Sequence, residues 1–466
     1  MRIQCGLLAA TLVLTHTFAL AQITGTSDGD TRSVAPAATS PLLGLNITAS
    51  EEDSGSMLPQ IPSIVGGRGL VLSPSGEQER SNYLRAGLNV GATYDDNASM
   101  VSTGAVDNTS LSIFPNIGIE HTSPTTQWNL DYAAGFTANQ RLSNRNQGSH
   151  DLNFGSQFRL SPHVTFRLNE DFALTTGFFD ANNAAAIESG GPNGSVLAPL
   201  SKQRSSVTDA EADYHFALHD LAGVSGSFYN LHYSDISQGT LFTDTKTSTG
   251  TAFWLHQLGR NWIGASYRFQ HLVFSPGSGT TDVNSVFAVD TLSLAKVLTL
   301  SGFAGAEHSA NHGVAQGPGI ASSLSQTSPL FGADAAWNGQ RTGAAIGFSR
   351  QVSDGGGVLG AVRMQEVHGA IRHELLPGWS LGVLGRYGNN KSLTTALGGS
   401  TATAIDTWSA NISVQHNLRK NLRLDFGYAH EFQDQSGTLD PAFLGGAHRN
   451  RVYITIGYQW AKPLGR

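Results

Sequence analysis

The sequence predicts an all-β protein: a closed antiparallel transmembrane β-barrel of about 18 strands, preceded by a disordered N-terminal segment. Three observations favour this fold class. Apolar and polar residues alternate along many segments, short and long connections alternate between those segments, and tryptophans lie near segment ends. Composition agrees, because 14% charged residues, 54 glycines and one cysteine argue against a helical bundle, a disulfide scaffold and a helical membrane protein. The net charge of -7 offers no basic surface, which excludes nucleic acid as a partner.

The first 21 residues have the features of a signal peptide. Arg2 precedes a mostly apolar stretch, and Ala19-Leu20-Ala21 fits the small-x-small cleavage rule, so we expect the mature chain to begin at Gln22. Cys5 leaves with this peptide, which excludes disulfides and thiolate metal sites from the mature protein. Residues 22–82 are rich in Ser, Gly, Pro, Ala and Thr and predict a low-complexity exported segment. A flexible tail is the favoured interpretation, and a plug or partner anchor is the alternative.

From Tyr83 onward the hydrophobic pattern has a period of two, which is typical of strands with one apolar face. The alternating apolar residues include Leu84, Ala86, Leu88, Val90, Ala92 and Tyr94, then Trp128, Leu130, Tyr132, Ala134 and Phe136, and finally Val452, Ile454, Ile456, Tyr458 and Trp460. Periodicity alone fits a soluble β-sandwich as well as a membrane barrel.

Connection lengths distinguish these two architectures. Short turns are expected near His121–Thr126, Ser161–His163, Leu218–Leu221, Gly259–Asn261, Ala295–Val297, Asn338–Gln340, Glu374–Gly378 and Leu418–Asn421. Longer polar links lie between them, including one near Ser275–Asp282. This alternation predicts an even number of strands with both chain ends on the short-turn side, as bacterial outer-membrane barrels have. The barrel is expected over residues 83–460, with residues 461–466 as a C-terminal extension, and Asn338-Gly339 predicts a type I′ hairpin turn.

Tryptophans near the predicted short turns suggest an interfacial aromatic belt, in which the ring lies in hydrocarbon and its N–H reaches water. Trp262 shares this position near a turn, whereas Trp408 lies beside a long link. The predicted belt consists of Trp128, Trp254, Trp337, Trp379 and Trp460. The alternative is that the tryptophans are scattered core residues.

A spanning sheet must close, because every backbone N–H and C=O in hydrocarbon needs a partner. At about 18 strands the ring is too wide for wall side chains to fill, so an aqueous lumen is expected unless a loop or the tail occludes it.

The signal peptide, the alternation and a last strand ending Tyr458-Gln459-Trp460 together resemble Gram-negative outer-membrane β-barrels of porin type. The chain is also loosely similar to uncharacterised barrels associated with exopolysaccharide export. The resemblance covers Tyr83–Trp460, although this family usually ends on the aromatic residue itself, whereas Ala461–Arg466 follow here. It implies a location in the bacterial cell outer membrane, with outer-membrane lipid and the barrel-assembly machinery as partners.

The inward side of the alternation carries charges of both signs. The predicted lumen residues are Arg85, Arg159, Arg167, Arg268, Arg363, Arg386 and Arg423, with Glu120, Asp131, Asp171, Asp209, Glu211, Asp213, Asp334 and Asp425. Two interpretations remain open: these groups pair across neighbouring strands and rigidify the wall, or they set a field that selects solutes. Glu170 interrupts the apolar face of its strand and suggests a local register shift.

Asp209, Glu211 and Asp213 form the densest acidic stripe, which ends beside His215. A Ca²⁺ ion is conceivable there, but pairing with arginines of the next strand is the favoured interpretation. Asp213 and His215 have the residue types of a general-base pair, yet no serine in a glycine elbow accompanies them. We therefore predict no catalytic residues, no metal site, no cofactor and no enzymatic activity.

The leading functional hypothesis is a channel for passive passage of polar solutes or for export of a polysaccharide. The alternative is a surface-display or adhesin-like barrel, in which the long loops Asp180–Gln203 and Ser309–Thr327 bind a partner while the lumen stays plugged.

Overall fold

A computed structural model describes residues 82–143, 146–175, 202–234, 243–275, 279–295, 297–312, 324–357, 360–393, 404–436 and 446–464. The predicted signal peptide, nearly all of the exported segment and most of the two long loops expected to bind a partner lie outside these ranges. None of the helices described is long and apolar enough to cross a membrane.

The described chain forms eighteen β-strands and one 3-10 turn. The strands are β1 (Tyr83–Asp95), β2 (Asn108–Thr122), β3 (Thr126–Asn139), β4 (Gln147–Arg159), β5 (Val164–Thr175), β6 (Gln203–Ala217), β7 (Asp220–Tyr233), β8 (Asp244–Leu258), β9 (Asn261–Ser275), β10 (Gly279–Ala295), β11 (Leu298–His312), β12 (Leu324–Asn338), β13 (Thr342–Ser353), β14 (Val362–Leu376), β15 (Trp379–Ser392), β16 (Ala404–Arg419), β17 (Leu422–Ser436) and β18 (Ala447–Pro463), and the turn η3 spans Gly355–Gly357.

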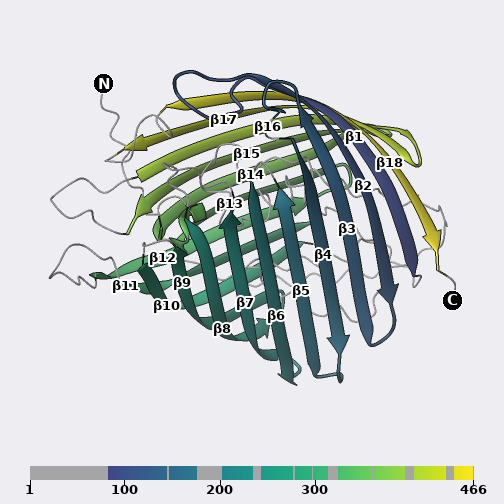
Figure 1. Cartoon of the computed structure of the whole chain (residues 1–466). Coiled ribbons are helices and arrows are strands. Elements are labelled where there is room, and N and C mark those ends of the chain that lie inside the picture. Colours follow the sequence, from purple (N-terminus) through teal and green to yellow (C-terminus); the bar gives the residue numbers. More distant parts are fainter. Residues whose placement is uncertain are drawn as a thin grey trace. The chain divides into compact units, whose positions relative to one another are not determined.

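Each strand pairs antiparallel with the next along the chain, and β1 pairs with β18, so the sheet is a closed barrel (Figure 1). This confirms the predicted fold class and strand number. The closing pair runs from Tyr83 opposite Pro463 to Asp95 opposite Arg451. The last strand thus continues three residues beyond Trp460, because the start of β1 provides it with a partner there.

Two predicted connections differ in the structure. β9 ends at Ser275 and β10 begins at Gly279, so this link, expected to be long, is as short as the turns at the opposite end of the barrel. The type I′ turn is also wrong, because Asn338 still pairs with Gly343 and neither Asn338 nor Gly339 has a positive φ. The turn lies one residue later, where the N–H of Gly339 donates to the carbonyl of Thr342.

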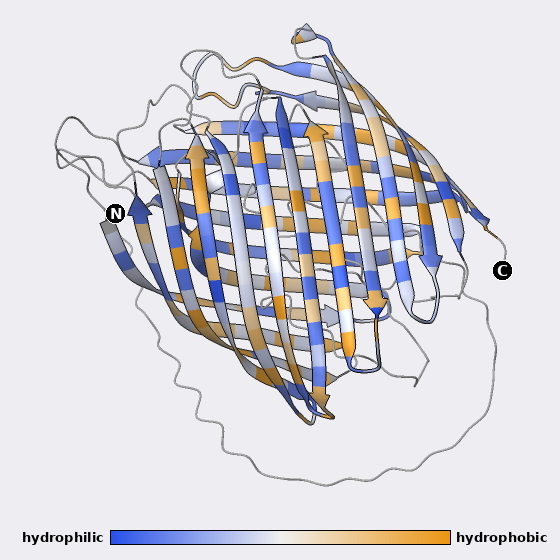
Figure 2. Cartoon of the chain, turned by 60° about the horizontal axis from the view of Figure 1, so that its bottom comes forward, coloured by the Kyte–Doolittle hydropathy of each residue, from blue (hydrophilic) through white to orange (hydrophobic). Residues whose placement is uncertain are grey.

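The two faces of the sheet differ in polarity, and Figure 2 shows the resulting banding along the strands. Large apolar side chains on the outer face are exposed, among them Val90, Ile117, Phe136, Val224, Val286, Ile346, Ile412 and Ile454. A closed sheet pairs its backbone groups, and an apolar exterior matches hydrocarbon. The chain is therefore a transmembrane β-barrel of the bacterial outer membrane.

Glu170 keeps its outward position without any register shift. It lies opposite Phe154 on one side and Thr208 on the other, within uninterrupted pairing of β5 with β4 and β6. The hydroxyl of Thr208 donates a hydrogen bond to its carboxylate. The predicted misregister is wrong, because a neighbouring polar side chain partners the carboxylate on the outer face.

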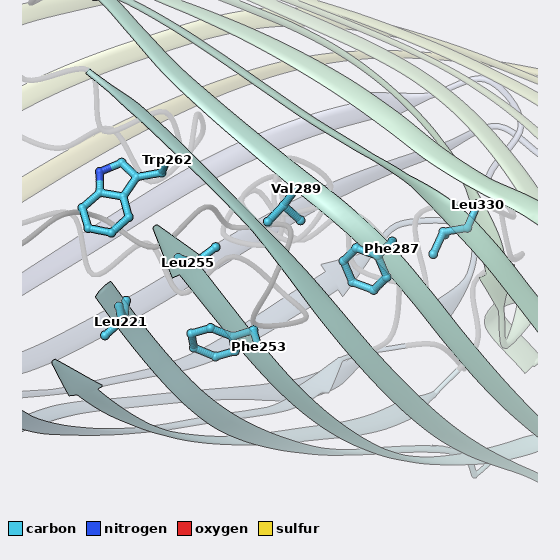
Figure 3. Packing of buried hydrophobic residues seen from close by; sticks show 7 residues of the cluster. All are labelled: Leu221, Phe253, Leu255, Trp262, Phe287, Val289 and Leu330. Atoms are coloured by element: carbon cyan, nitrogen blue, oxygen red, sulfur yellow. The ribbon is translucent and has the colours of Figure 1, made fainter. Parts of the chain in front are cut away.

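An apolar cluster lies on the inner face of the strands from β7 to β12. It consists of Leu221, Phe253, Leu255, Trp262, Phe287, Val289 and Leu330 (Figure 3). Trp262 therefore does not share the outward orientation expected for tryptophans near turns. It packs inward, because Asn261 begins β9 and the next residue falls on the inner side of the pleat.

Candidate functional site

The inner wall carries most of the predicted lumen charges. These side chains lie on the strand faces opposite to those that bear the exposed apolar residues. They are Arg85, Glu120, Asp131, Arg159, Arg167, Asp171, Asp209, Glu211, Asp213, Arg268, Asp334, Arg386, Arg423 and Asp425. Arg363 differs from the prediction, because it shares the strand face of Val367 and Ile371, which are exposed on the outside.

Many of these charges pair with carboxylates on the adjacent strand. Arg85 Nη1 lies 2.8 Å from Glu120 Oε1, and Arg386 Nη2 lies 2.6 Å from Glu366 Oε2. Within one strand, Arg423 Nε lies 2.8 Å from Asp425 Oδ2. The first two of these ion pairs join neighbouring strands, and cross-strand pairs stabilise a sheet. The structure therefore contains the cross-strand pairing that was one of the two interpretations of the sequence.

The acidic stripe of β6 faces an arginine. Arg167 of β5 lies opposite Glu211, and its Nη1 donates to Glu211 Oε1 at 2.5 Å and also to Asp213. Within the ranges that the structure describes, no group of three or more His, Cys, Asp or Glu side chains is placed to hold a metal ion. A guanidinium group thus lies where a bound cation had been considered.

Sequence reasoning missed a second set of inner charges near the long-link ends of the strands. Glu431 of β17 accepts hydrogen bonds from Arg449 and Arg451 of β18, each at 2.6 Å. Glu431 lies on the same face of β17 as Asp425, so continuing the period-two pattern toward the end of that strand was the signal that could have identified it.

The pairing of β12 with β13 ends halfway along β12. The two strands pair from Asn338 opposite Gly343 as far as Phe331 opposite Arg350, and the remaining residues of β12 have no partner in β13. We call this point the seam. All other neighbouring strands pair over most of their length.

Pro329 gives a local reason for the seam. The N–H of Asn338 points toward β11, since it donates to the carbonyl of Val297, and backbone groups alternate in direction along a strand. Odd-numbered residues of β12 therefore point toward β13, and Pro329 has no N–H to donate there. If the register continued, Pro329 would lie opposite Val352.

Beyond the seam, the end of β13, the start of β14 and the described residues next to them turn into the barrel. We call the described residues 351–357 and 360–363 the inner hairpin. Val352 is only 3% exposed, although Ile346 on the same face of β13 is 62% exposed. Val352 packs with Leu272, Phe274 and Val283, which come from the inner faces of β9 and β10.

The link at the tip of the inner hairpin contacts the wall several strands away. The hydroxyl of Tyr233, at the end of β7, donates a 2.8 Å hydrogen bond to the carbonyl of Gly356. Gly355 and Gly356 have positive φ values of 61° and 62°, which glycine adopts without strain. Five strands separate β7 from β13 in the ring, so this contact runs across the interior and narrows the passage.

One carboxylate joins the inner hairpin to the wall. Glu307 of β11 accepts a hydrogen bond from Ser328 Oγ of β12 at 3.0 Å and another from the N–H of Val352 at 3.1 Å. It also interacts electrostatically with Arg268 and Arg363. Glu307 was absent from the predicted lumen residues, although it shares the inner strand face of Phe303 and the period-two pattern could have identified it. Its contact with the hairpin follows only from the inward turn.

The five predicted belt tryptophans lie on the outer face near the short-turn ends of their strands. Trp254, Trp337, Trp379 and Trp460 are exposed, and Trp128 shares the face of Tyr132 and Phe136. Their placement at a membrane interface stays a prediction.

No protein-family model matches the sequence, and neither does any curated protein. Solved structures that resemble it include Pseudomonas aeruginosa OpdK with vanillate, at 10% identity over 81% of this chain and 99% of that one, with a TM-score of 0.40. Pseudomonas aeruginosa OccK2 (OpdF) in complex with glucuronate shows 10% identity over 82% and 98%, with a TM-score of 0.43. Acinetobacter baumannii OccAB3 shows 10% identity over 82% and 99%, with a TM-score of 0.41. The assignment rests on the strand pairing and the apolar exterior: the chain is an outer-membrane β-barrel with the strand number of the larger porins.

Proposed function

We propose that the protein is a passive channel for small polar solutes across the outer membrane. The observation that carries this proposal is the closed ring of eighteen strands with a charged inner wall. Side chains fill the interior of an eight-stranded barrel, whereas rings of 16–18 strands leave room for an aqueous channel. No energy source is needed, because solutes cross such a channel down their gradient.

The inner hairpin supports a restriction to small solutes. Its tip is held by Tyr233 of β7, and its apolar side packs on β9 and β10, so it lies across the path between the two ends of the barrel. A folded segment inside the lumen reduces the cross-section that a solute meets. The charged side chains of the inner wall then determine which solutes bind or pass in the narrowed region.

Single-channel recording on purified, refolded protein tests the proposal. We expect stepwise conductance in a planar bilayer, and swelling of proteoliposomes in solutions of small sugars that declines as sugar size increases. A variant with residues 354–361 replaced by Asn-Gly removes the tip of the inner hairpin and should conduct more. A bilayer that stays insulating with correctly folded protein would contradict the proposal.

The export of a polysaccharide and the surface-display alternative remain predictions. The loops that would bind a partner are described only at their ends, and no described residue favours either hypothesis. The absence of enzymatic activity also stays a prediction.

A further inference from the structure

Two arginines interact with one carboxylate at the seam, and a third arginine lies near one of them. Glu307 interacts electrostatically with Arg268 of β9 and Arg363 of β14, and Arg363 in turn interacts with Arg350 of β13. Arg350 is the last residue of β13 that pairs with β12. Within this group of described residues, three positive charges meet one negative charge.

The guanidinium groups of this cluster have unused donors. Arg268 is only 8% exposed, and among the described residues nothing accepts a hydrogen bond from its Nε or Nη2. Its Nη1 donates a long hydrogen bond of 3.4 Å to Gln351 Oε1 in the inner hairpin. The Nε atoms of Arg350 and Arg363 are likewise buried without an acceptor in the part of the chain described.

Several other arginines of the inner wall form an ion pair with a carboxylate. Arg85, Arg167 and Arg423 each lie within 2.8 Å of a carboxylate oxygen. Arg268 instead lies against the ring of Phe287 on the inner face, 5.6 Å from its centroid. Arg350 lies against the ring of Phe331 on the strand face of Ile346, 5.9 Å from its centroid. A ring face attracts a cation, but it leaves the in-plane N–H donors free for an anion.

Unpaired buried guanidinium donors are costly, and like charges close together add to the cost. An oxyanion removes both penalties, because its oxygens accept from the guanidinium fork and its charge balances the excess. A neutral solute removes neither.

We propose that Arg268 and Arg363 form a binding site for a small oxyanion, a carboxylate or phosphate group, at the inner hairpin, with Arg350 adding positive charge beside Arg363. Glu307 keeps the hairpin in place and prevents the two arginines from binding the anion too tightly for release. This inference rests on the proposed channel function and specifies its substrate class: small anionic solutes pass in preference to cations of similar size.

Equilibrium binding tests the site without requiring an open pore. Isothermal titration of the full refolded chain in detergent, with potassium acetate in one experiment and potassium phosphate in another, should show saturable binding of at least one of them. Arg268→Gln should weaken that binding about tenfold or more, since it removes charge-assisted hydrogen bonds. Arg268→Lys keeps the positive charge but lacks the paired donors of the guanidinium group. Its anion affinity should therefore lie between those of the wild type and Arg268→Gln.

Arg85→Gln is the matched control. It removes one inner positive charge that belongs to an existing ion pair and that is distant from the seam along the chain. Its binding should equal that of the wild type. Heat-shifted mobility in electrophoresis verifies that each variant is folded. Binding of neither anion, or equal weakening by Arg85→Gln and Arg268→Gln, would overturn the site.

Bilayer recordings separate this inference from the proposed function. With a gradient of potassium chloride, the reversal potential should show anion preference in the wild type and a shift toward cations in Arg268→Gln. A channel that conducts but prefers cations overturns the anion site alone. A folded protein that does not conduct overturns the channel, and saturable anion binding would still support the site.

Discussion

The main-chain N–H of Val352 in β13 donates a 3.1 Å hydrogen bond to Oε2 of Glu307 in β11, although β12 lies between these strands in the ring. In a continuous sheet this N–H would point to the carbonyl of Pro329, its partner by register. A side-chain carboxylate thus accepts the hydrogen bond that a backbone carbonyl of the neighbouring strand would accept in a continuous sheet. Ser328 holds the other carboxylate oxygen, so one side chain joins the wall to the inner hairpin.

Glu307→Ala should loosen the inner hairpin. The N–H of Val352 loses its acceptor in a buried position, which costs about 1–3 kcal/mol. We expect larger current fluctuations in single-channel traces and faster proteolysis near residues 354–361. Glu307→Gln retains an acceptor oxygen and should have a smaller effect. Identical quiet traces for wild type and Glu307→Ala would show that the hairpin does not depend on this contact.

Pro329→Val should change the pore, because it restores an N–H that points toward β13. With this donor, β12 can pair further along β13, which draws the hairpin toward the wall and raises the conductance. Pro115→Val is the matched control. Pro115 lacks the same donor toward β3, but there the pairing resumes in the same register at Asn116. A conductance increase in both variants, or in neither, would argue against Pro329 as the cause of the seam.

Arg167→Gln should destabilise the barrel more than Arg85→Gln. Arg167 compensates Glu211 and Asp213, whose side chains are 5% and 2% exposed, so its loss leaves two buried carboxylates and costs about 3 kcal/mol or more. The pair of Arg85 and Glu120 is 41% and 34% exposed, and its loss should cost about 1 kcal/mol or less. Urea unfolding of the refolded proteins in detergent measures the difference. Equal midpoints for the two variants would contradict this ranking.

Gly264→Ala should impair folding. A methyl group at this position would overlap the carbonyl oxygen of Trp254 on β8 and lie 2.7 Å from Leu255 Cδ2, and the backbone cannot move without disturbing the strand pair. Gly385→Ala is the control, since a methyl group there meets nothing within 4 Å. We expect a lower yield of heat-modifiable, folded protein for Gly264→Ala alone. Equal yields would show that β8 and β9 can separate to accept the methyl group.

The strands and the face of most side chains could be predicted from the sequence. A period of two is a local property of the strand. The opposite faces of Tyr132 and Asp131 can therefore be predicted without knowledge of the rest of the chain. Alternating link lengths then provide the strand number, since each hairpin is also local. The same logic failed at Trp262 and Asn338, where the exact start or end of a strand determines the outcome.

The candidate site depended on relationships that the pattern does not contain. Arg363 has the parity of the outer face, yet the inward turn of β13 and β14 brings it near Glu307. Pro329 was visible in the sequence, but its consequence follows only from the direction of its missing N–H and from its partner in the register. Which inner side chains meet across the lumen is decided by ring closure, because closure brings together strands that are distant in sequence. The sequence by itself therefore determined the wall of this protein, and the tertiary structure decided what lies across its interior.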